Sequence, residues 1–295
     1  MKTFSKNHNQ ENFPVASFLS RKENREYILK YYNFARFADD IADSEILVKT
    51  EKIMALETLS NIIKGYDLKE YKQFNYAYEL KDILINLELS HRYASDLIIA
   101  FLDDAKNKEY NTWNELINYC RYSAAPVGKF ILALNKQSLS THFAADALSI
   151  ALQLINHIQD VKKDLVKLNR FYIPNDYLKE FNVKKEDFLK DESSNKLNLL
   201  KNKMLDSVSG LIHDSEKLPK MVTTYRLKLE ILFIINLAKK LTKKLRTSDI
   251  LKNNVKLNKF DWVRIFIKTL LQSIITRRNL AIKDIQKSTS DEINQ

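Results

Sequence analysis

The scarcity of glycine and proline is the feature that most limits how this chain can fold. Its 295 residues include three glycines and four prolines. Residues 15–125 contain no proline and a single glycine, Gly65, and residues 129–173 contain neither. Tight β-hairpin turns depend on residues that tolerate positive φ, glycine above all, so a chain with so little glycine favours long helices. We therefore predict an all-α fold.

Apolar residues recur every three to four positions through both stretches, which is the pattern of amphipathic helices. We predict successive helices separated by loops near residues 64–68, 107–112, 125–128 and 170–194, where glycine, proline or polar clusters interrupt the pattern. One helical domain is expected over residues 11–286, because a chain of this length can form a single large core. Residues 1–10 and 287–295 are expected to be a frayed N-terminus and a polar tail.

The composition argues against several classes of protein. The single cysteine, Cys120, cannot form an internal disulfide or a paired-cysteine zinc site, and we expect it to pack in the interior of a cytoplasmic protein. The N-terminal sequence has no apolar signal-peptide core, and the longest apolar run, residues 97–102, is too short to span a bilayer. We therefore expect neither a secreted protein nor one that spans a membrane.

The net charge of +11 comes mostly from scattered lysines. It does not come from an arginine–aromatic strip of the type that binds nucleic acid, so no nucleic-acid partner is expected. A solvated lysine-rich surface is the favoured explanation. An anionic substrate or an anionic membrane face is the alternative.

A first acidic helix face is predicted in the segment YYNFARFADDIAD, residues 31–43. At about 100° per residue, one arc of the helix holds a phenol, a guanidinium and three carboxylates, those of Tyr32, Arg36, Asp39, Asp40 and Asp43. The other side carries the apolar residues Phe34, Phe37, Ala38 and Ile41, which we interpret as plain core. This helix is expected to be buried on one side and acidic on the other.

A second polar face is predicted in QLINHIQDVKKD, residues 153–164. Gln153 and His157 share its arc with a ladder of oxygen ligands at i, i+4 and i+8, namely Asn156, Asp160 and Asp164. Acids one helical turn apart repel each other, so two such faces suggest a cation that offsets the repulsion. All-oxygen ligation suits Mg²⁺. An ordinary solvated acidic surface is the alternative, and we interpret His157 as a bystander on the polar face.

The two segments resemble the aspartate-rich motifs of the squalene and phytoene synthase family, the trans-isoprenyl diphosphate head-to-head synthases. FARFADDIAD is followed, more than a hundred residues later, by QLINHIQDVKKDLVKLNRFYIP, in the order typical of the family. The similarity runs from about Glu11 to Arg278 and includes YCRYSAAPVG at residues 119–128 and the segment 229–246. The start ENFPVAS, residues 11–17, favours a bacterial branch, the hydroxysqualene synthases of the hopanoid pathway.

The resemblance implies an isoprenoid synthase bundle with a central cleft, and roles for the matching residues. Two or three magnesium ions would be bound by Asp39, Asp43, Asn156, Asp160 and Asp164. The substrate would be bound by Arg36, Gln153, Arg170 and Tyr172. The catalytic set would comprise Tyr32, Arg36, Asp40 and Tyr119, with the ring of Tyr119 facing positive charge.

The implied reaction is magnesium-dependent ionisation of presqualene diphosphate and capture of the cation by water, which gives hydroxysqualene and diphosphate. Such a carbon–oxygen lyase would need no NAD(P)H. A sister prenyltransferase that makes presqualene diphosphate, squalene or phytoene from prenyl diphosphates is the nearest alternative. A non-enzymatic assembly factor of the same fold is another, disfavoured because the motif acids are present. Lipid substrates also suggest hand-off to neighbouring pathway enzymes and peripheral contact with the inner face of the membrane.

Two positions depart from the family pattern, and one segment has two interpretations. Asn169 stands where glycine is common, a mild change because asparagine tolerates the left-handed conformation. Ala125 stands where asparagine commonly precedes proline, which could alter a helix break beside the pocket. Residues 251–268 mix lysines with the apolar residues Phe260, Trp262, Phe266 and Ile267. A terminal bundle helix with a basic outer face is the favoured interpretation of this segment, and an interfacial helix is the alternative.

Overall fold

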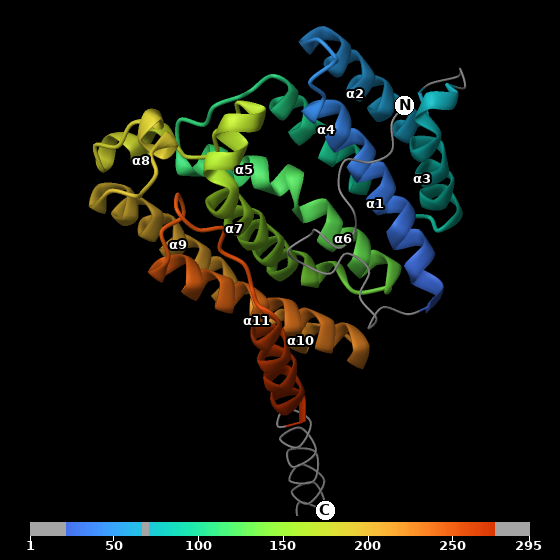
Figure 1. Ribbon diagram of the computed structural model, residues 1–295. Coiled ribbons are helices and arrows are strands. Elements are labelled where there is room, and N and C mark those ends of the chain that lie inside the picture. The colour runs from blue at the N-terminus through green and yellow to red at the C-terminus, as the bar shows by residue number, and fades with distance from the viewer. Residues whose placement is uncertain (1–21, 67–70, 275–295) are drawn as a thin grey trace, which may run out of the picture.

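The computed structural model describes residues 22–66 and 71–274, which form a bundle of helices (Figure 1). The longer helices are α1 (Lys22–Asp43), α2 (Lys49–Lys64), α3 (Asn75–Asn86), α4 (Arg92–Ala105), α5 (Trp113–Ser123), α6 (Ala125–Leu134), α7 (His142–Leu168), α9 (Asn195–Ser215) and α11 (Tyr225–Thr247). Shorter ones are η2 (Lys72–Phe74), η3 (Leu139–Thr141), α8 (Asn175–Glu180), η4 (Lys185–Leu189) and α10 (Leu218–Met221). Residues 259–274 form a further helix. All regular secondary structure in the described ranges is helical, which confirms the predicted fold class.

The expectations for the two ends of the chain lie outside the described residues. They are the tails at residues 1–10 and 287–295, the domain limits at 11 and 286, and the ENFPVAS segment. No helix in the described ranges is long and apolar enough to cross a bilayer.

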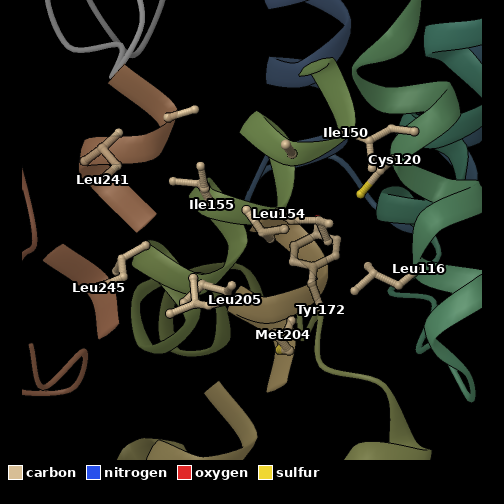
Figure 2. Close-up of a cluster of buried hydrophobic side chains, with 14 of the residues drawn as sticks. Leu116, Cys120, Ile150, Leu154, Ile155, Tyr172, Met204, Leu205, Leu241 and Leu245 are labelled. Atoms are coloured by element: carbon tan, nitrogen blue, oxygen red, sulfur yellow. The ribbon is translucent and has the colours of Figure 1, made fainter. Parts of the chain in front are cut away.

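Two hydrophobic clusters hold the bundle together. One is formed by α1 to α4, with Phe130 of α6, and it contains the predicted core residues Phe34 and Phe37 of α1. The other is formed mainly by α5, α7, α9 and α11 and contains Cys120 (Figure 2). Because α4 contacts α1 and α2 as well as α5 and α6, it joins the two clusters. Burial also raises the pKa of the Cys120 thiol, in agreement with a packing role.

Most of the predicted helix ends are confirmed. Helix α2 ends at Gly65, whose φ of 78° is the left-handed conformation that glycine adopts without strain. The Thr112 side chain accepts a hydrogen bond from the Glu115 backbone N–H and caps α5. Helix α7 ends at Leu168, and the next residue, Asn169, has φ 51° and ψ 36°. This left-handed conformation suits the glycine that is common here in the family, and asparagine tolerates it.

Two of the predicted loops are wrong in part. Residues 125–128 are the first turn of α6, and the break lies one residue earlier, at Ala124. Proline is tolerated there because the first helical turn leaves its N–H groups unbonded in any case. The long segment 170–194 contains the short helices α8 and η4.

Helix α6 crosses α7 closely at Gly128. A Cβ atom at this position would lie 2.6 Å from the Ser149 side-chain oxygen, which is too close for an undisturbed contact. Both residues line the large cavity described below. The absence of a side chain at Gly128 therefore lets the two helices meet at the wall of this cavity.

The favoured interpretation of residues 251–268 is also wrong in part. Residues 251–258 are not helical, and the helix begins at residue 259. Its outer face carries the exposed cations Arg264 and Lys268, as expected, but it also carries exposed apolar side chains, among them Phe260 and Phe266. Trp262, by contrast, is half-buried and lies against Phe233 of α11, with ring centroids 5.8 Å apart.

Candidate active site

A cavity of about 950 Å³ lies among α1, α4, α5, α6, α7 and α11, and residues of both hydrophobic clusters line it. This volume is at the upper end of the range typical for small-molecule sites. Its lining is divided. Most charged and polar groups come from α1, α4, α7 and residues 170–172, while most groups from α6, α11 and the first half of α7 are apolar, with Glu230 of α11 an exception.

The α1 wall carries most of the predicted acidic face. Tyr32, Arg36, Asp39 and Asp43 line the cavity, which confirms that they share one side of the helix. Arg36 is buried and donates from Nη1 to Asp39 at 2.6 Å and from Nη2 to Asp40 at 3.2 Å. Spacings of three and four residues place these groups next to one another on a helix. Asp40 pairs with Arg36 but is not part of the cavity lining.

The α7 wall carries the second polar face. The side chains of Gln153, Asn156, Asp160 and Asp164 line the same cavity. The apolar residues between them, including Leu154 and Val161, pack into the larger hydrophobic cluster. The helical period thus separates the two kinds of side chain as predicted, and α7 directs the oxygen ladder into the cavity.

Arg170 connects the two walls. It follows the left-handed residue Asn169, which turns the chain at the end of α7. Its Nη1 donates to Asp43 of α1 at 2.5 Å, and its side chain is 7% exposed. Within the described residues, the buried Arg170 Nε and Ser123 Oγ have no hydrogen-bond partner. Both residues line the cavity.

A buried polar cluster lies beside these walls. Asp104 of α4 accepts hydrogen bonds from the hydroxyl of Tyr119, at 3.0 and 2.9 Å to its two oxygens, and from that of Tyr172 at 2.7 Å. The Tyr172 ring stacks on the His157 imidazole with centroids 3.8 Å apart. All four side chains line the cavity. His157 is therefore part of a buried aromatic wall rather than a bystander on a polar face.

Burial sets the protonation of this site. It raises the pKa of Asp104 to about 6, because Arg170 and the two tyrosine hydroxyls offset only part of the desolvation. Burial, together with the neighbouring Asp43 carboxylate, raises the pKa of Asp39 to about 7. Burial lowers the pKa of His157 to about 3, with Arg170 acting in the same direction, so the imidazole is neutral at physiological pH. Carboxyl groups held in such an unfavourable environment are frequent at functional sites.

Asp104 was missed by the sequence analysis, although a signal for it exists. It lies seven residues after Leu97 and three after Phe101, and both of these are buried on α4. A carboxylate at these spacings falls on the apolar stripe of its helix. An acid on an apolar stripe is costly to bury unless it is hydrogen-bonded, which makes it a candidate functional residue.

The donor set fits magnesium bound together with a substrate. Asp39 and Asp43 line one wall of the cavity, and Asn156, Asp160 and Asp164 line the other. No three acidic, histidine or cysteine side chains in the described part of the chain converge closely enough to hold a cation alone. Mg²⁺ commonly binds through one or two carboxylates and completes its shell with water and substrate phosphate. Acids divided between two walls suit that mode of binding.

The rest of the cavity suits an apolar chain. Its lining includes Phe101, Phe130, Leu148, Leu152, Leu227, Ile231, Ile234, Leu257 and Trp262. No ionic group would be needed to hold a ligand against these side chains, because burial of apolar surface supplies the affinity. The arrangement is that of a site for an amphipathic molecule with an anionic head and a long hydrocarbon part.

Comparison with known proteins agrees with this geometry. The family model for squalene/phytoene synthase matches residues 6–261. The chain is 36% identical to a hydroxysqualene synthase of Rhodopseudomonas palustris over 92% of each chain. It is 37% identical to one of Zymomonas mobilis over 86% of this chain and 85% of the relative. The crystal structure of squalene synthase HpnC from Alicyclobacillus acidocaldarius superposes with a TM-score of 0.69 at 25% identity, covering 81% of this chain and 89% of that one.

Proposed function

Since the chain belongs to the squalene/phytoene synthase family and is an enzyme acting on isoprenoid diphosphates, we propose that its substrate is presqualene diphosphate. In the proposed reaction the carbon–oxygen bond to diphosphate breaks, and diphosphate leaves with the electron pair. The cation rearranges, a water oxygen bonds to carbon, and a proton is lost, so the products are hydroxysqualene and inorganic diphosphate. The choice within the family rests on relatives named hydroxysqualene synthase that are 36% and 37% identical to this chain.

Magnesium is part of this proposal. Two or three ions would be held by Asp39 and Asp43 on α1 and by Asn156, Asp160 and Asp164 on α7, where they would supply Lewis-acid stabilisation to the departing diphosphate. The observation that supports this assignment is the position of the two oxygen-rich helix faces on the walls of one cavity.

The basic and polar side chains would bind the diphosphate directly. Arg36 and Arg170 are buried and charged, and a guanidinium forms strong charge-assisted hydrogen bonds with phosphate oxygens. Gln153 and Tyr172 line the same region and can donate further hydrogen bonds. Tyr32 lies on the cavity side of α1, one helical turn before Arg36, and would contribute at the same end. Asp40, through its ion pair with Arg36, would position that arginine rather than touch the substrate.

The apolar walls would protect the cation once diphosphate has left. They exclude bulk water, so that capture is limited to water admitted at the polar end. The aromatic face of Tyr119, buried beside Tyr172 and Asp104, would stabilise positive charge. The reaction is redox-neutral, so no nicotinamide cofactor is part of the proposal. Because substrate and product are lipids, the proposal includes peripheral membrane contact and hand-off to neighbouring enzymes of the pathway.

The test is to incubate the purified full chain with Mg²⁺ and either presqualene diphosphate or farnesyl diphosphate. Extracted lipids are identified by mass spectrometry, with Asp160→Ala as the blank. Hydroxysqualene from presqualene diphosphate alone supports the proposal. Presqualene diphosphate, squalene or phytoene made from farnesyl or geranylgeranyl diphosphate would instead identify a sister synthase. Turnover that is unchanged when Mg²⁺ is removed by chelation would contradict the metal assignment.

A further inference from the structure

The helix formed by residues 259–274 packs on the bundle through a largely polar face. Its buried residues recur every four positions and are Asp261, Ile265, Thr269 and Ser273. Asp261 pairs with Lys240 at 3.1 Å and with Lys244 at 2.8 Å, both from α11. Asn236 of α11 donates to the Thr269 hydroxyl at 3.1 Å. The contact with α11 is therefore held by hydrogen bonds and ion pairs more than by apolar packing.

The outward face of this helix is apolar. The exposed side chains are 37% to 79% accessible and comprise Phe260, Val263, Phe266, Ile267, Leu270, Leu271 and Ile274. Their spacing places them on the side of the helix opposite Ile265. A helix of a soluble bundle normally shows the reverse arrangement, with apolar residues inward and polar residues outward. Figure 1 shows this helix, in red, at the edge of the bundle and pointing away from it.

The charge on this helix is basic. Lys259, Arg264 and Lys268 are exposed, and the helical period places Arg264 and Lys268 along one edge of the apolar face. Asp261, the one acid among residues 259–274, is buried in its ion pairs with α11. An apolar face bordered by cations is the pattern of helices that lie in the headgroup region of anionic bilayers.

The same helix borders the cavity. Trp262 faces inward and lines the cavity, together with Leu257 in the preceding segment and its neighbours Asn254 and Lys256. The exposed residues Phe260 and Val263 are its close neighbours in sequence. The apolar outer surface of the helix and this part of the cavity wall thus meet at the start of the helix.

We propose that the outer face of residues 260–274 docks on an anionic lipid bilayer and brings the Trp262 end of the cavity to the membrane surface. The docking proposal is argued from this face alone. The further step, transfer of lipid between the bilayer and the cavity, rests on the proposed function. A second copy of the chain is a poorer occupant, since pairing two such faces would bring the cations at their edges together without an anionic partner.

The docking test is co-sedimentation of the full chain with vesicles of phosphatidylcholine alone or of equal parts phosphatidylcholine and phosphatidylglycerol. The wild type is expected to bind the anionic vesicles at least about tenfold more tightly. Ile267→Ser combined with Leu271→Ser is expected to weaken binding about tenfold. The matched control is Leu139→Ser with Leu199→Ser, two exposed leucines on other elements, and it should bind as the wild type does.

Equal vesicle binding by the two double variants would overturn the proposal. So would a wild-type dimer, detected by light scattering, that the Ile267/Leu271 variant abolishes while vesicles bind neither protein. For lipid transfer, the variant should match the wild type on presqualene diphosphate in detergent micelles and be about tenfold slower on substrate embedded in anionic vesicles. Equal rates on embedded substrate would overturn the transfer step. If the wild type turns over no substrate in either form, the proposed function fails, and co-sedimentation still decides the docking surface.

Discussion

Asp104 and Asp261 are equally inaccessible to solvent, each 6% exposed, yet Asp104 lies deep in the bundle and Asp261 lies near its surface, and their surroundings are opposite. Asp261 is held by Lys240 and Lys244, and the hydrogen bond from Lys244 is the main reason that its pKa is lowered to about 2. Asp104 accepts hydrogen bonds from two neutral hydroxyls, and burial raises its pKa to about 6. The negative charge of Asp261 is balanced by two lysines, whereas ionisation of Asp104 is only partly compensated and costs stability. Burial of an acid is therefore a weak sign of function, and incomplete compensation beside a cavity is a stronger one.

The largest effect is expected for an acid that faces the cavity without a structural role. Asp160→Asn keeps the shape of the side chain and removes the charge proposed to hold magnesium. Turnover should fall on the order of 10²–10³-fold, as it does when one electrostatic contact to a developing charge is removed. The melting temperature should change little, because the contact seen for Asp160 is a 3.4 Å pair with the exposed Lys163. Steady-state assays and thermal denaturation measure the two effects.

The control for Asp160 is Asp146→Asn on the same helix. Asp146 pairs with Lys129 at 2.9 Å and does not line the cavity. The Asp146→Asn variant should keep turnover within about threefold of wild type, because loss of a partly exposed ion pair has little effect on the fold. If Asp160→Asn is as active as Asp146→Asn, the cavity-facing acids of α7 have no part in turnover.

A smaller effect is expected for Asp104→Asn, which weakens the anchoring of the Tyr119 and Tyr172 hydroxyls. Turnover should fall about 10- to 100-fold, the cost typical of removing a residue whose hydrogen bonds orient neighbouring groups of the site. The folded pKa of about 6 lies above the unfolded value of 3.8, so the native state holds the proton more tightly. Wild-type stability should therefore fall by up to about 3 kcal/mol as pH rises from 4 to above 6, and the variant should lack this loss. Urea denaturation at pH 4 and pH 7 measures the difference.

Asp103→Asn is the matched control for this pH dependence. Asp103 precedes Asp104 on α4, is more exposed, and pairs with Lys108 at 2.8 Å. Its substitution should change stability by less than about 1 kcal/mol at either pH. A stability difference between Asp104→Asn and wild type that is independent of pH would show that Asp104 titrates normally.

The sequence allowed the fold class and two walls of the site to be predicted. The scarcity of glycine indicated helices, and the helical period correctly placed Asp39, Asp43, Asp160 and Asp164 on cavity-facing sides. These predictions succeeded because they depend on local geometry along one helix. The loop expected at residues 125–128 failed because proline is compatible with a first helical turn as well as with a loop.

The parts that escaped prediction depend on contacts between elements distant in sequence. Asp104 becomes significant only when α5 and the segment after α7 bring Tyr119 and Tyr172 to it. His157 could not be distinguished from a bystander until Tyr172 was seen to stack on it. For residues 259–274, composition showed a mixture of basic and apolar side chains. Which of them faces outward is decided by the polar partners that α11 offers to Asp261 and Thr269.

The smallest effect on activity is expected for Asp261→Asn, which removes the ion-paired acid that was compared with Asp104. Its folded pKa of about 2 lies below the unfolded 3.8, so its ionised form contributes stability above about pH 4 that is lost as pH falls toward 2. At pH 7 the substitution should cost about 1–2 kcal/mol, because Lys240 and Lys244 are partly exposed and can be solvated instead. Turnover on micellar substrate should stay within about twofold, because Asp261 does not line the cavity. Urea denaturation at pH 7 and pH 2.5 gives the stabilities.

Asp206→Asn provides the control, since Asp206 also pairs with a cation, Arg246 at 2.7 Å, but is itself largely exposed. Its cost should be below about 0.5 kcal/mol, because solvent screens an exposed pair. If Asp261→Asn proves as mild as Asp206→Asn at pH 7, the ion pairs with α11 do not hold the C-terminal helix in place. If instead Asp261→Asn lowers turnover as strongly as Asp104→Asn, the distinction between a compensated structural acid and an uncompensated acid at the cavity is wrong.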